Sequence, residues 1–210
     1  AAPPAAAPAA PASRVVQQEP TQKEREAVDT AVRAVALGLQ SASKPEVAAK
    51  AVATGCKALA ELMGAKNGRP IAHNQALVAE TGGGALLQAL SVFSADARVQ
   101  PYVMTALTYV ISSNPGTCAA VSGNGGVALL LTAMGNHTSS VGVQRRACNM
   151  ALQLALYGGA EVCVALAQVG FRLSAEWMRR DSDARCVLQG GAMQAIVAAL
   201  QAHGAQDASE

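Results

Sequence analysis

The glycine-rich stretch "GNGGVA", residues 123–128, comes nearer than any other part of the chain to a motif with known chemistry. Gly123, Gly125 and Ala128 match the spacing GxGxxG/A, in which backbone N–H groups at a helix N-terminus hold a dinucleotide pyrophosphate. That fingerprint needs a strand before it and an acidic residue about 20 positions later. The preceding residues "TCAAVS" read as helix, and the later region reads "GNHTSSVGVQ". We therefore expect a turn between helices here, and no phosphate-binding loop.

The other glycine run, "ETGGGALL", lacks the Lys and the hydroxyl residue that a P-loop places after its glycines. His73, His137 and His203 fall where loops or helix ends are expected. Asp181 and Asp183 lie among arginines in "RRDSDAR", which is typical of a solvated surface. No nucleophile, base and orienting group come together, so the sequence predicts that the protein is not an enzyme.

The cysteines are odd in number and form no CxxC pair: Cys56, Cys118, Cys148, Cys163 and Cys186. All five lie among Ala, Val and Leu, which is typical of small buried thiols in a reducing compartment. A zinc site needs clustered Cys and His ligands, and the spacing provides none. We expect no metal and no cofactor.

The composition favours helices. Of the 210 residues, 51% are apolar, carried mainly by Ala, Leu and Val, whereas aromatic residues make up only 3%. Ala and Leu are strong helix formers, while β-branched and aromatic residues favour strands. A core of small side chains also requires helices in close contact. The predicted fold class is all-α.

The charge balance excludes some partners. A net charge of +2 is too small to indicate contact with nucleic acid. The longest apolar runs, residues 127–131 and 162–167, are far shorter than the roughly 18–20 residues of a membrane span. No Asp, Glu, Lys or Arg lies between Arg98 and Arg145. We expect another protein to cover this surface, although Ser, Thr, Asn and Gln could also solvate it.

The first 20 residues, "AAPPAAAPAAPASRVVQQEP", are too rich in proline for a regular helix and too rich in alanine to bury much surface. We predict an extended tail over residues 1–22, docked on a neighbouring subunit, then a helical domain over 23–204 and a short tail over 205–210. The chain begins without Met, as a fragment would, and this also fits a mature end left after removal of an organellar transit peptide. The expected compartment is a mitochondrion or plastid, with a cytoplasmic or ciliary location left open.

Internal repeats organise the helical domain. Four short apolar stretches end in glycine: "ALVAETGG", "CAAVSGNGG", "CVALAQVG" and "CVLQGG". With Gly84, Gly126 and Gly170 taken as equivalent, the intervals are 42 and 44 residues. The longer segments "RVQPYVMTALTYVI" and "GVQRRACNMALQLAL" share a Val-Gln start, also 44 residues apart. We predict a unit of short helix, glycine corner, medium helix and long helix.

This unit resembles the armadillo repeat family over roughly residues 27–204, with related HEAT-type helical pairs as the alternative. The resemblance implies a right-handed α-solenoid of about three to four repeats. An earlier copy begins at "AVDTAVRAVALGLQ", 48 residues upstream at matching positions. One departure is an irregular half repeat over residues 170–190, which suits an atypical capping unit.

Peptide-binding members of the family carry a ladder of Trp and Asn, four residues apart, on successive third helices. Alignment puts Lys57, Thr105 and Asn149 at the Trp position, and Glu61, Tyr109 and Gln153 at the Asn position. No such ladder exists, so the resemblance implies no recognition of a basic localisation peptide. These six residues are the candidate protein-binding residues of a concave face, unless they are only its solvated side.

The half repeat holds the only tryptophan, Trp177, near Arg172, Arg179 and Arg180. Trp and Arg are the residue types most enriched at interface hot spots, which makes these four a possible interface. We favour the alternative in which Trp177 fills the gap of the missing half repeat and the arginines face outward. The sequence thus predicts a non-catalytic scaffold or accessory subunit that contacts other proteins of a larger assembly. The alternative is a free adaptor that holds an extended peptide in its concave groove.

Overall fold

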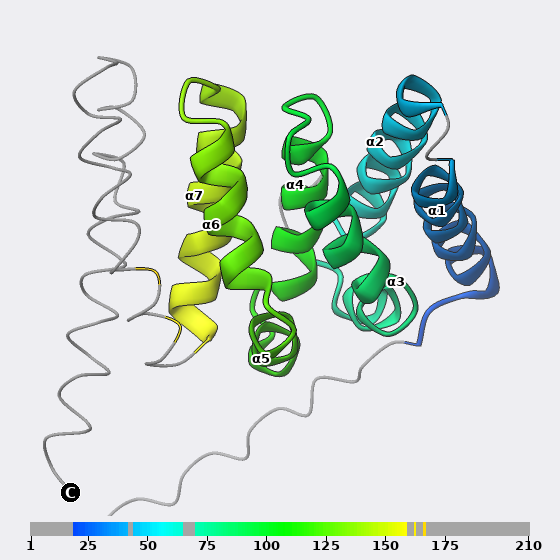
Figure 1. The fold of residues 1–210 in the computed structure, drawn as a ribbon. Helices are drawn as coiled ribbons and strands as arrows, with labels where there is room; N and C mark the ends of the chain where they lie inside the picture. The colour runs from blue at the N-terminus through cyan, green and yellow to red at the C-terminus, as the bar shows by residue number, and fades with distance from the viewer. Residues whose placement is uncertain (1–18, 42–43, 65–69, 159–161, 163–165, 167–210) are drawn as a thin grey trace, which may run out of the picture.

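A computed structural model describes residues 19–41, 44–64 and 70–158, together with Val162 and Leu166. Over these residues the chain forms α-helices and no strand, which confirms the all-α prediction for this part (Figure 1). The half repeat over 170–190, the C-terminal tail and all but the last few residues of the N-terminal tail lie outside the described residues. The helices are α1 (Gln22–Gln40), α2 (Pro45–Leu62), α3 (Ala72–Val92), α4 (Gln100–Ile111), α5 (Pro115–Gly123), α6 (Gly126–Asn136) and α7 (Val141–Tyr157).

The helices stack side by side in two layers (Figure 1). In one layer α4 lies between α2 and α7 and packs against both. In the other, α3 lies between α1 and the α5–α6 pair. Each helix turns an apolar stripe toward the space between the layers, as Val28, Ala31 and Val35 do on α1. The result is one continuous core that runs the length of the stack.

The first described helix begins with a capping box. Thr21 Oγ1 accepts a hydrogen bond from the Glu24 backbone N–H at 3.3 Å, and the Glu24 carboxylate accepts one from the Thr21 N–H at 2.8 Å. This reciprocal pair satisfies N–H groups that a helix N-terminus leaves without partners. Asn114 and Ser140 cap α5 and α7 in the simpler one-sided manner.

Glycines bring α1 and α2 together. A Cβ on Gly55 would lie 2.8 Å from the Ala31 carbonyl oxygen, and one on Gly38 would lie 2.9 Å from the Ala48 carbonyl oxygen. Both separations are too short for a carbon–oxygen contact, so only glycine allows this approach. Val35 and Val52, each fully buried, fill the space on either side.

The predicted corner at residues 123–126 is present. Gly125 adopts the left-handed conformation, with φ of 80°, between α5 and α6, and the two helices diverge by 69°. A side chain on Gly126 would collide with Val121, so the second glycine lets α6 begin against the end of α5. The stretch is a turn between helices, as its sequence context predicted.

The predicted corner at Gly84 is wrong. Gly82, Gly83 and Gly84 lie inside α3, which runs without a break from Ala72 to Val92. None of the three has a positive φ. Glycine permits a sharp turn but does not impose one, and here Gly82 serves instead to seat α3 against Val32 of α1. The predicted short and medium helices of this repeat are therefore one long helix. The junctions predicted at Gly170 and Gly191 lie outside the described residues.

A pair of buried glutamines shows the 44-residue offset in its contacts. The side-chain amide of Gln100 donates to the Leu90 carbonyl oxygen at 2.9 Å, and that of Gln144 donates to the Met134 carbonyl oxygen at 2.7 Å. Gln144 also donates to the His137 carbonyl oxygen at 2.9 Å. Both glutamines belong to the repeated Val-Gln pairs, and each satisfies a carbonyl near the C-terminus of the preceding helix. We call these two contacts the glutamine latches.

Candidate protein-binding surfaces

A hollow of about 270 Å³ lies between α4 and α7, on the outer face of the α2–α4–α7 layer. It is lined by Pro70, Thr105, Thr108, Tyr109, Ser112, Arg146, Asn149, Leu152 and Gln153. We call it the α4–α7 hollow. Sites for drug-sized ligands measure about 300–1,000 Å³, so this one has room for one or two side chains of a partner.

The α4 wall of the hollow offers acceptors. The hydroxyl of Thr105 donates its proton to the Pro101 carbonyl at 2.6 Å, and that of Ser112 donates to the Thr108 carbonyl at 2.8 Å. Bonds from a hydroxyl to the carbonyl four residues earlier are common in helices. Each oxygen keeps lone pairs that a ligand can use. The backbone carbonyls of Tyr109 and Ser112 accept from Gln75 of α3, which fixes this wall from behind.

The α7 wall offers donors. Arg146, Asn149 and Gln153 follow one another at intervals of three and four residues, so they share one face of the helix. Their side chains have no hydrogen-bond or ion-pair partner among the described residues. Among the described residues that line the hollow, Arg146 is the one with a charged side chain.

Four of the six predicted groove residues come together here: Thr105, Tyr109, Asn149 and Gln153. Lys57 and Glu61 lie on α2 and do not line the hollow, although α2 packs beside α4 in the same layer. The alignment missed Arg146. It lies three residues before Asn149, so its place on the same helix face was the available signal. The predicted interface of Arg172, Trp177, Arg179 and Arg180 lies outside the described residues.

A second, larger hollow of about 680 Å³ lies between α3 and α5. Small residues form its sides, including Ala79, Gly83 and Ala120. Its amides are already used, because Asn114 caps α5 and Asn124 donates to the Ala120 carbonyl. Of the described residues that line it, Glu80 is the one with a charged side chain. These residues do not provide the converging polar groups that fix a small ligand.

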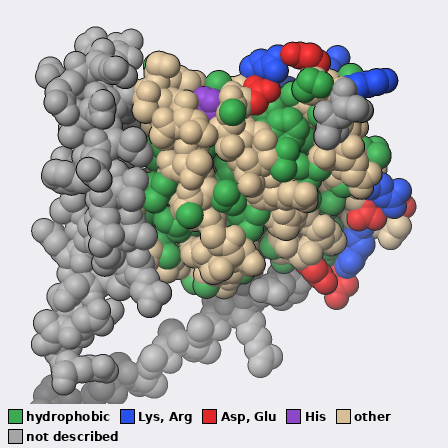
Figure 2. Space-filling view, viewed as in Figure 1, with side chains coloured by type: hydrophobic (Ala, Val, Ile, Leu, Met, Phe, Trp, Pro, Cys, Tyr) green, Lys and Arg blue, Asp and Glu red, His purple; other side chains and the backbone are tan. Residues whose placement is uncertain are grey.

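Charge is distributed unevenly over the surface. Figure 2 shows Lys, Arg, Asp and Glu gathered over the α1–α2 half, with apolar and uncharged side chains over the α4–α7 half. The second half contains the stretch between Arg98 and Arg145. Large apolar side chains are exposed over the whole described surface, on α1, α2 and α3 (Leu37, Val47 and Val92) as well as on α4 and α7 (Tyr102, Val141 and Leu156). Among the described residues no single helix is long and apolar enough to cross a membrane, and only the sharply bent α5–α6 pair satisfies the length and composition test jointly.

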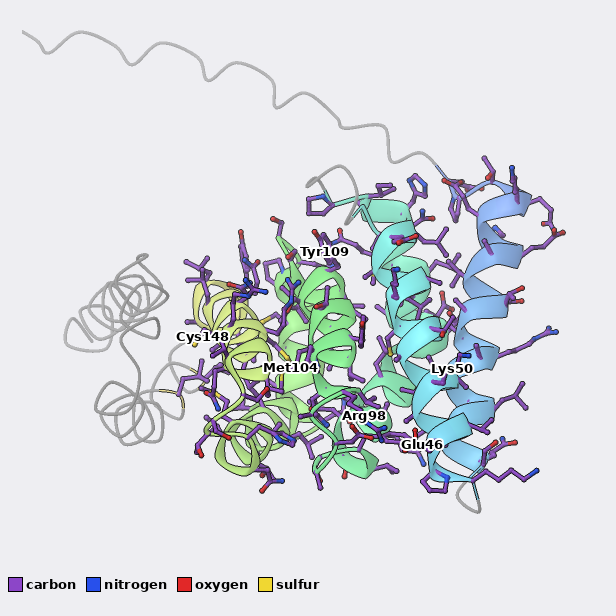
Figure 3. The ribbon with its side chains drawn as sticks, turned by 90° about the horizontal axis from the view of Figure 1, so that it is seen from above. Glu46, Lys50, Arg98, Met104, Tyr109 and Cys148 are labelled. Carbon is purple, nitrogen blue, oxygen red and sulfur yellow. The ribbon has the colours of Figure 1, made fainter. Side chains whose placement is uncertain are left out.

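At the boundary between the halves, charges are paired. Arg98 contacts Glu46 at 3.0 Å and Asp96 at 2.9 Å, and joins the N-terminus of α2 to the loop before α4 (Figure 3). The Arg98 guanidinium lowers the pKa of Asp96 below its ordinary value, and the two carboxylates raise the pKa of Arg98. These three groups are engaged with one another and do not form a site.

One histidine does meet a carboxylate, which the sequence did not predict. His73 Nε2 lies 3.3 Å from Glu24 Oε1, across 49 residues of chain. Hydrogen bonds from the Thr21 side chain and backbone, with a further one from His73, lower the pKa of Glu24 to about 2. His137 contacts the Ser94 carbonyl oxygen at 2.9 Å, at the end of α6. Both contacts join helix ends.

The cysteines largely behave as predicted where they are described. Cys56 and Cys118 are fully buried, and Cys148 is partly buried. Burial raises the pKa of Cys56 to about 12 and raises that of Cys148 as well, because a thiolate is poorly solvated there. Among the described residues no three His, Cys, Asp or Glu side chains are placed to hold a metal ion.

Comparison of the chain with protein-family models, with curated proteins and with solved structures gives no significant match.

Proposed function

We propose that this protein is a non-catalytic, armadillo-like helical-repeat subunit that makes protein–protein contacts within a larger assembly. The two-layer stack, the latches 44 residues apart and the turn at Gly125 support the repeat assignment. The observation that carries the function is the stretch between Arg98 and Arg145, which contains no charged residue and covers much of the α4–α7 half. Charged residues are depleted at the cores of interfaces, whereas free surfaces usually carry them.

A charge placed on that surface tests the proposal. Ala128 is exposed on α6, inside the stretch without charges, so Ala128→Glu changes no core contact. We expect a tagged chain with Ala128→Glu to leave the high-mass assembly on velocity sedimentation of extracts from its own cells. The matched control is Gln40→Glu, an exposed site on the already charged α1. An assembly that retains the Ala128→Glu chain as well as the control contradicts the proposed interface.

The α4–α7 hollow favours a second candidate, a free adaptor that binds an extended segment of a partner. The two functions differ in the behaviour of the purified chain. A subunit taken out of its assembly leaves its apolar surface open and self-associates, whereas an adaptor stays monodisperse. Light scattering after size-exclusion chromatography, over a tenfold range of concentration, separates them.

A further inference from the structure

We propose that the α4–α7 hollow binds an acidic extended segment of a partner protein, with one carboxylate side chain held by Arg146 and the segment's backbone held between the two walls. This inference rests on the proposed role in protein–protein contact and names the chemistry of one contact.

Charge complementarity indicates that the partner contributes a carboxylate side chain. Arg146 is partly buried at the hollow and has no carboxylate partner among the described residues. By contrast, Arg98 holds two carboxylates. Arginine presents a rigid fork of donors that matches a carboxylate, and such charge-assisted bonds are about twice as strong as neutral ones. A segment that enters with Glu or Asp supplies a counter-charge that the described residues do not provide.

The hydrogen-bonding groups on the two walls indicate which kind of backbone the ligand has. The α7 wall donates through Asn149 and Gln153, whereas Thr105 and Ser112 on the α4 wall have given their protons to helix carbonyls and offer lone pairs. A ligand that fits both walls accepts on one side and donates on the other. An extended peptide can do so, because each edge of the strand presents C=O and N–H groups in alternation, so carbonyls are available to the α7 wall and N–H groups to the α4 wall. A nucleic-acid backbone offers phosphate acceptors only and leaves the α4 wall without a partner.

Spacing agrees with an extended segment. Asn149 and Gln153 are four residues apart, a rise of about 6 Å along the helix axis. Equivalent groups of an extended chain recur every second residue, at about 6.7 Å. Two side-chain amides can therefore reach successive outward carbonyls. Figure 3 places Tyr109, which lines the same hollow, on the side of α4 away from the Glu46–Arg98 pair.

The test uses the full chain and two short probes. The acidic probe is N-acetyl-Ala-Glu-Ala-Glu-Ala-amide, and its neutral match has Gln in place of Glu. We expect the acidic probe to shift the side-chain amide resonances of Asn149 and Gln153 in ¹⁵N–¹H spectra in a saturable manner. The neutral probe should bind at least tenfold more weakly, a difference of about 1.4 kcal/mol.

Adjacent arginines provide a matched pair of variants. Arg146→Gln should weaken the acidic probe at least tenfold, whereas Arg145→Gln should change its affinity less than twofold. Arg145 carries the same charge one residue away, but is exposed and does not line the hollow. Equal losses in both variants mean that only diffuse charge attracts the probe, which overturns the proposal. Equal binding of the acidic and the neutral probe would also overturn the proposal.

A charge reversal guards against a variant that merely disturbs the fold. Arg146→Glu should lose the acidic probe and gain binding of the same peptide with Lys in place of Glu, which misfolding cannot produce. Tighter binding of a ten-residue oligothymidylate than of the acidic probe, at the same resonances, would assign the hollow to nucleic acid instead. If the probes fail while Ala128→Glu still releases the chain from its assembly, only this inference falls. If Ala128→Glu has no effect, the subunit function falls independently.

Discussion

The α1–α2 pair and the helices from α3 to α7 are held together by different chemistry. In the first pair, Gly38 and Gly55 let two backbones approach until valines fill the remaining space. Farther along, helices lie against one another with buried glutamines that satisfy carbonyls at helix ends. The position that holds Gln100 and Gln144 holds Val52 in α2, 48 residues before Gln100, and Val52 is fully buried. Positions that the sequence alignment makes equivalent can therefore all lie in the core while the kind of contact changes.

The surfaces of the two regions differ in their content of charged side chains. The α1–α2 half carries the charges that a water-facing surface normally has, and the α4–α7 half carries few. Arg98 marks the boundary, since it pairs across it with Glu46. A repeat domain in which one end faces water and the other faces a partner would show this division.

The largest expected effect comes from breaking the glycine contact. Gly55→Val places a branched side chain against the Ala31 carbonyl and Val35, and we expect a loss of about 3 kcal/mol in the free energy of unfolding, measured by urea denaturation. Gly83→Val is the matched control, because a Cβ at Gly83 meets nothing within 4 Å. It should change stability by less than about 0.5 kcal/mol. Equal effects would mean that the α1–α2 contact is looser than the structure shows.

The glutamine latches come next. Gln144→Met removes the side-chain donor of the Met134 carbonyl and one of the two donors of the His137 carbonyl, and we expect a loss of about 2 kcal/mol. Gln100→Met should cost less, about 1 kcal/mol, because it deprives one carbonyl and also removes the buried, unpaired Gln100 Oε1. Urea midpoints of both variants measure the difference. A larger loss for Gln100→Met than for Gln144→Met contradicts this ranking.

A smaller effect is expected at acid pH. The pKa of Glu24 in the folded protein, about 2, lies below its ordinary value of 4.5, so the unfolded chain binds the proton first. The contribution of Glu24 to stability is therefore complete above about pH 4.5 and is lost as the pH falls toward 2. Glu24→Gln should flatten the pH dependence of the urea midpoint in this window. An unchanged acid limb would show that the Thr21 and His73 contacts do not favour the ionised form.

The smallest effect is expected at the boundary. Arg98→Gln removes the ion pairs to Glu46 and Asp96, but Arg98 and Glu46 are largely exposed, and exposed pairs contribute little. We expect a change in urea midpoint smaller than that of Gln100→Met, and one that disappears in 1 M salt because the pairs are screened. A salt-independent loss would instead indicate that the Arg98 side chain packs across the boundary.

The helical class and several contacts followed from local sequence. Ala and Leu content predicted the all-α class, and the Val-Gln pairs marked two equivalent helices whose glutamines occupy equivalent places. "TQKE" at residues 21–24 also fits the capping box that begins α1, a signal our sequence reading overlooked. The triple glycine at 82–84 led to the wrong prediction of a corner inside α3. A glycine run looks the same in sequence whether it turns the chain or admits a neighbouring helix.

Long-range contacts decided the rest. His73 meets Glu24 across 49 residues, and Gln75 reaches the end of α4, although neither pair shares any local pattern. The α4–α7 hollow is similar, since Arg146 becomes a site residue only because α7 packs against α4.

By itself the amino-acid sequence determined that the described part of the chain is helical, that two Val-Gln pairs lie 44 residues apart and that a long stretch carries no charge. Those properties depend on residue type and spacing along the chain, which act over a few turns of helix. Only the tertiary structure decided which glycines bend the chain, which carbonyls the glutamines satisfy and which donors face which acceptors across the hollow. These depend on how far apart two helices lie and how each is rotated about its axis, and that is set by packing among residues distant in sequence.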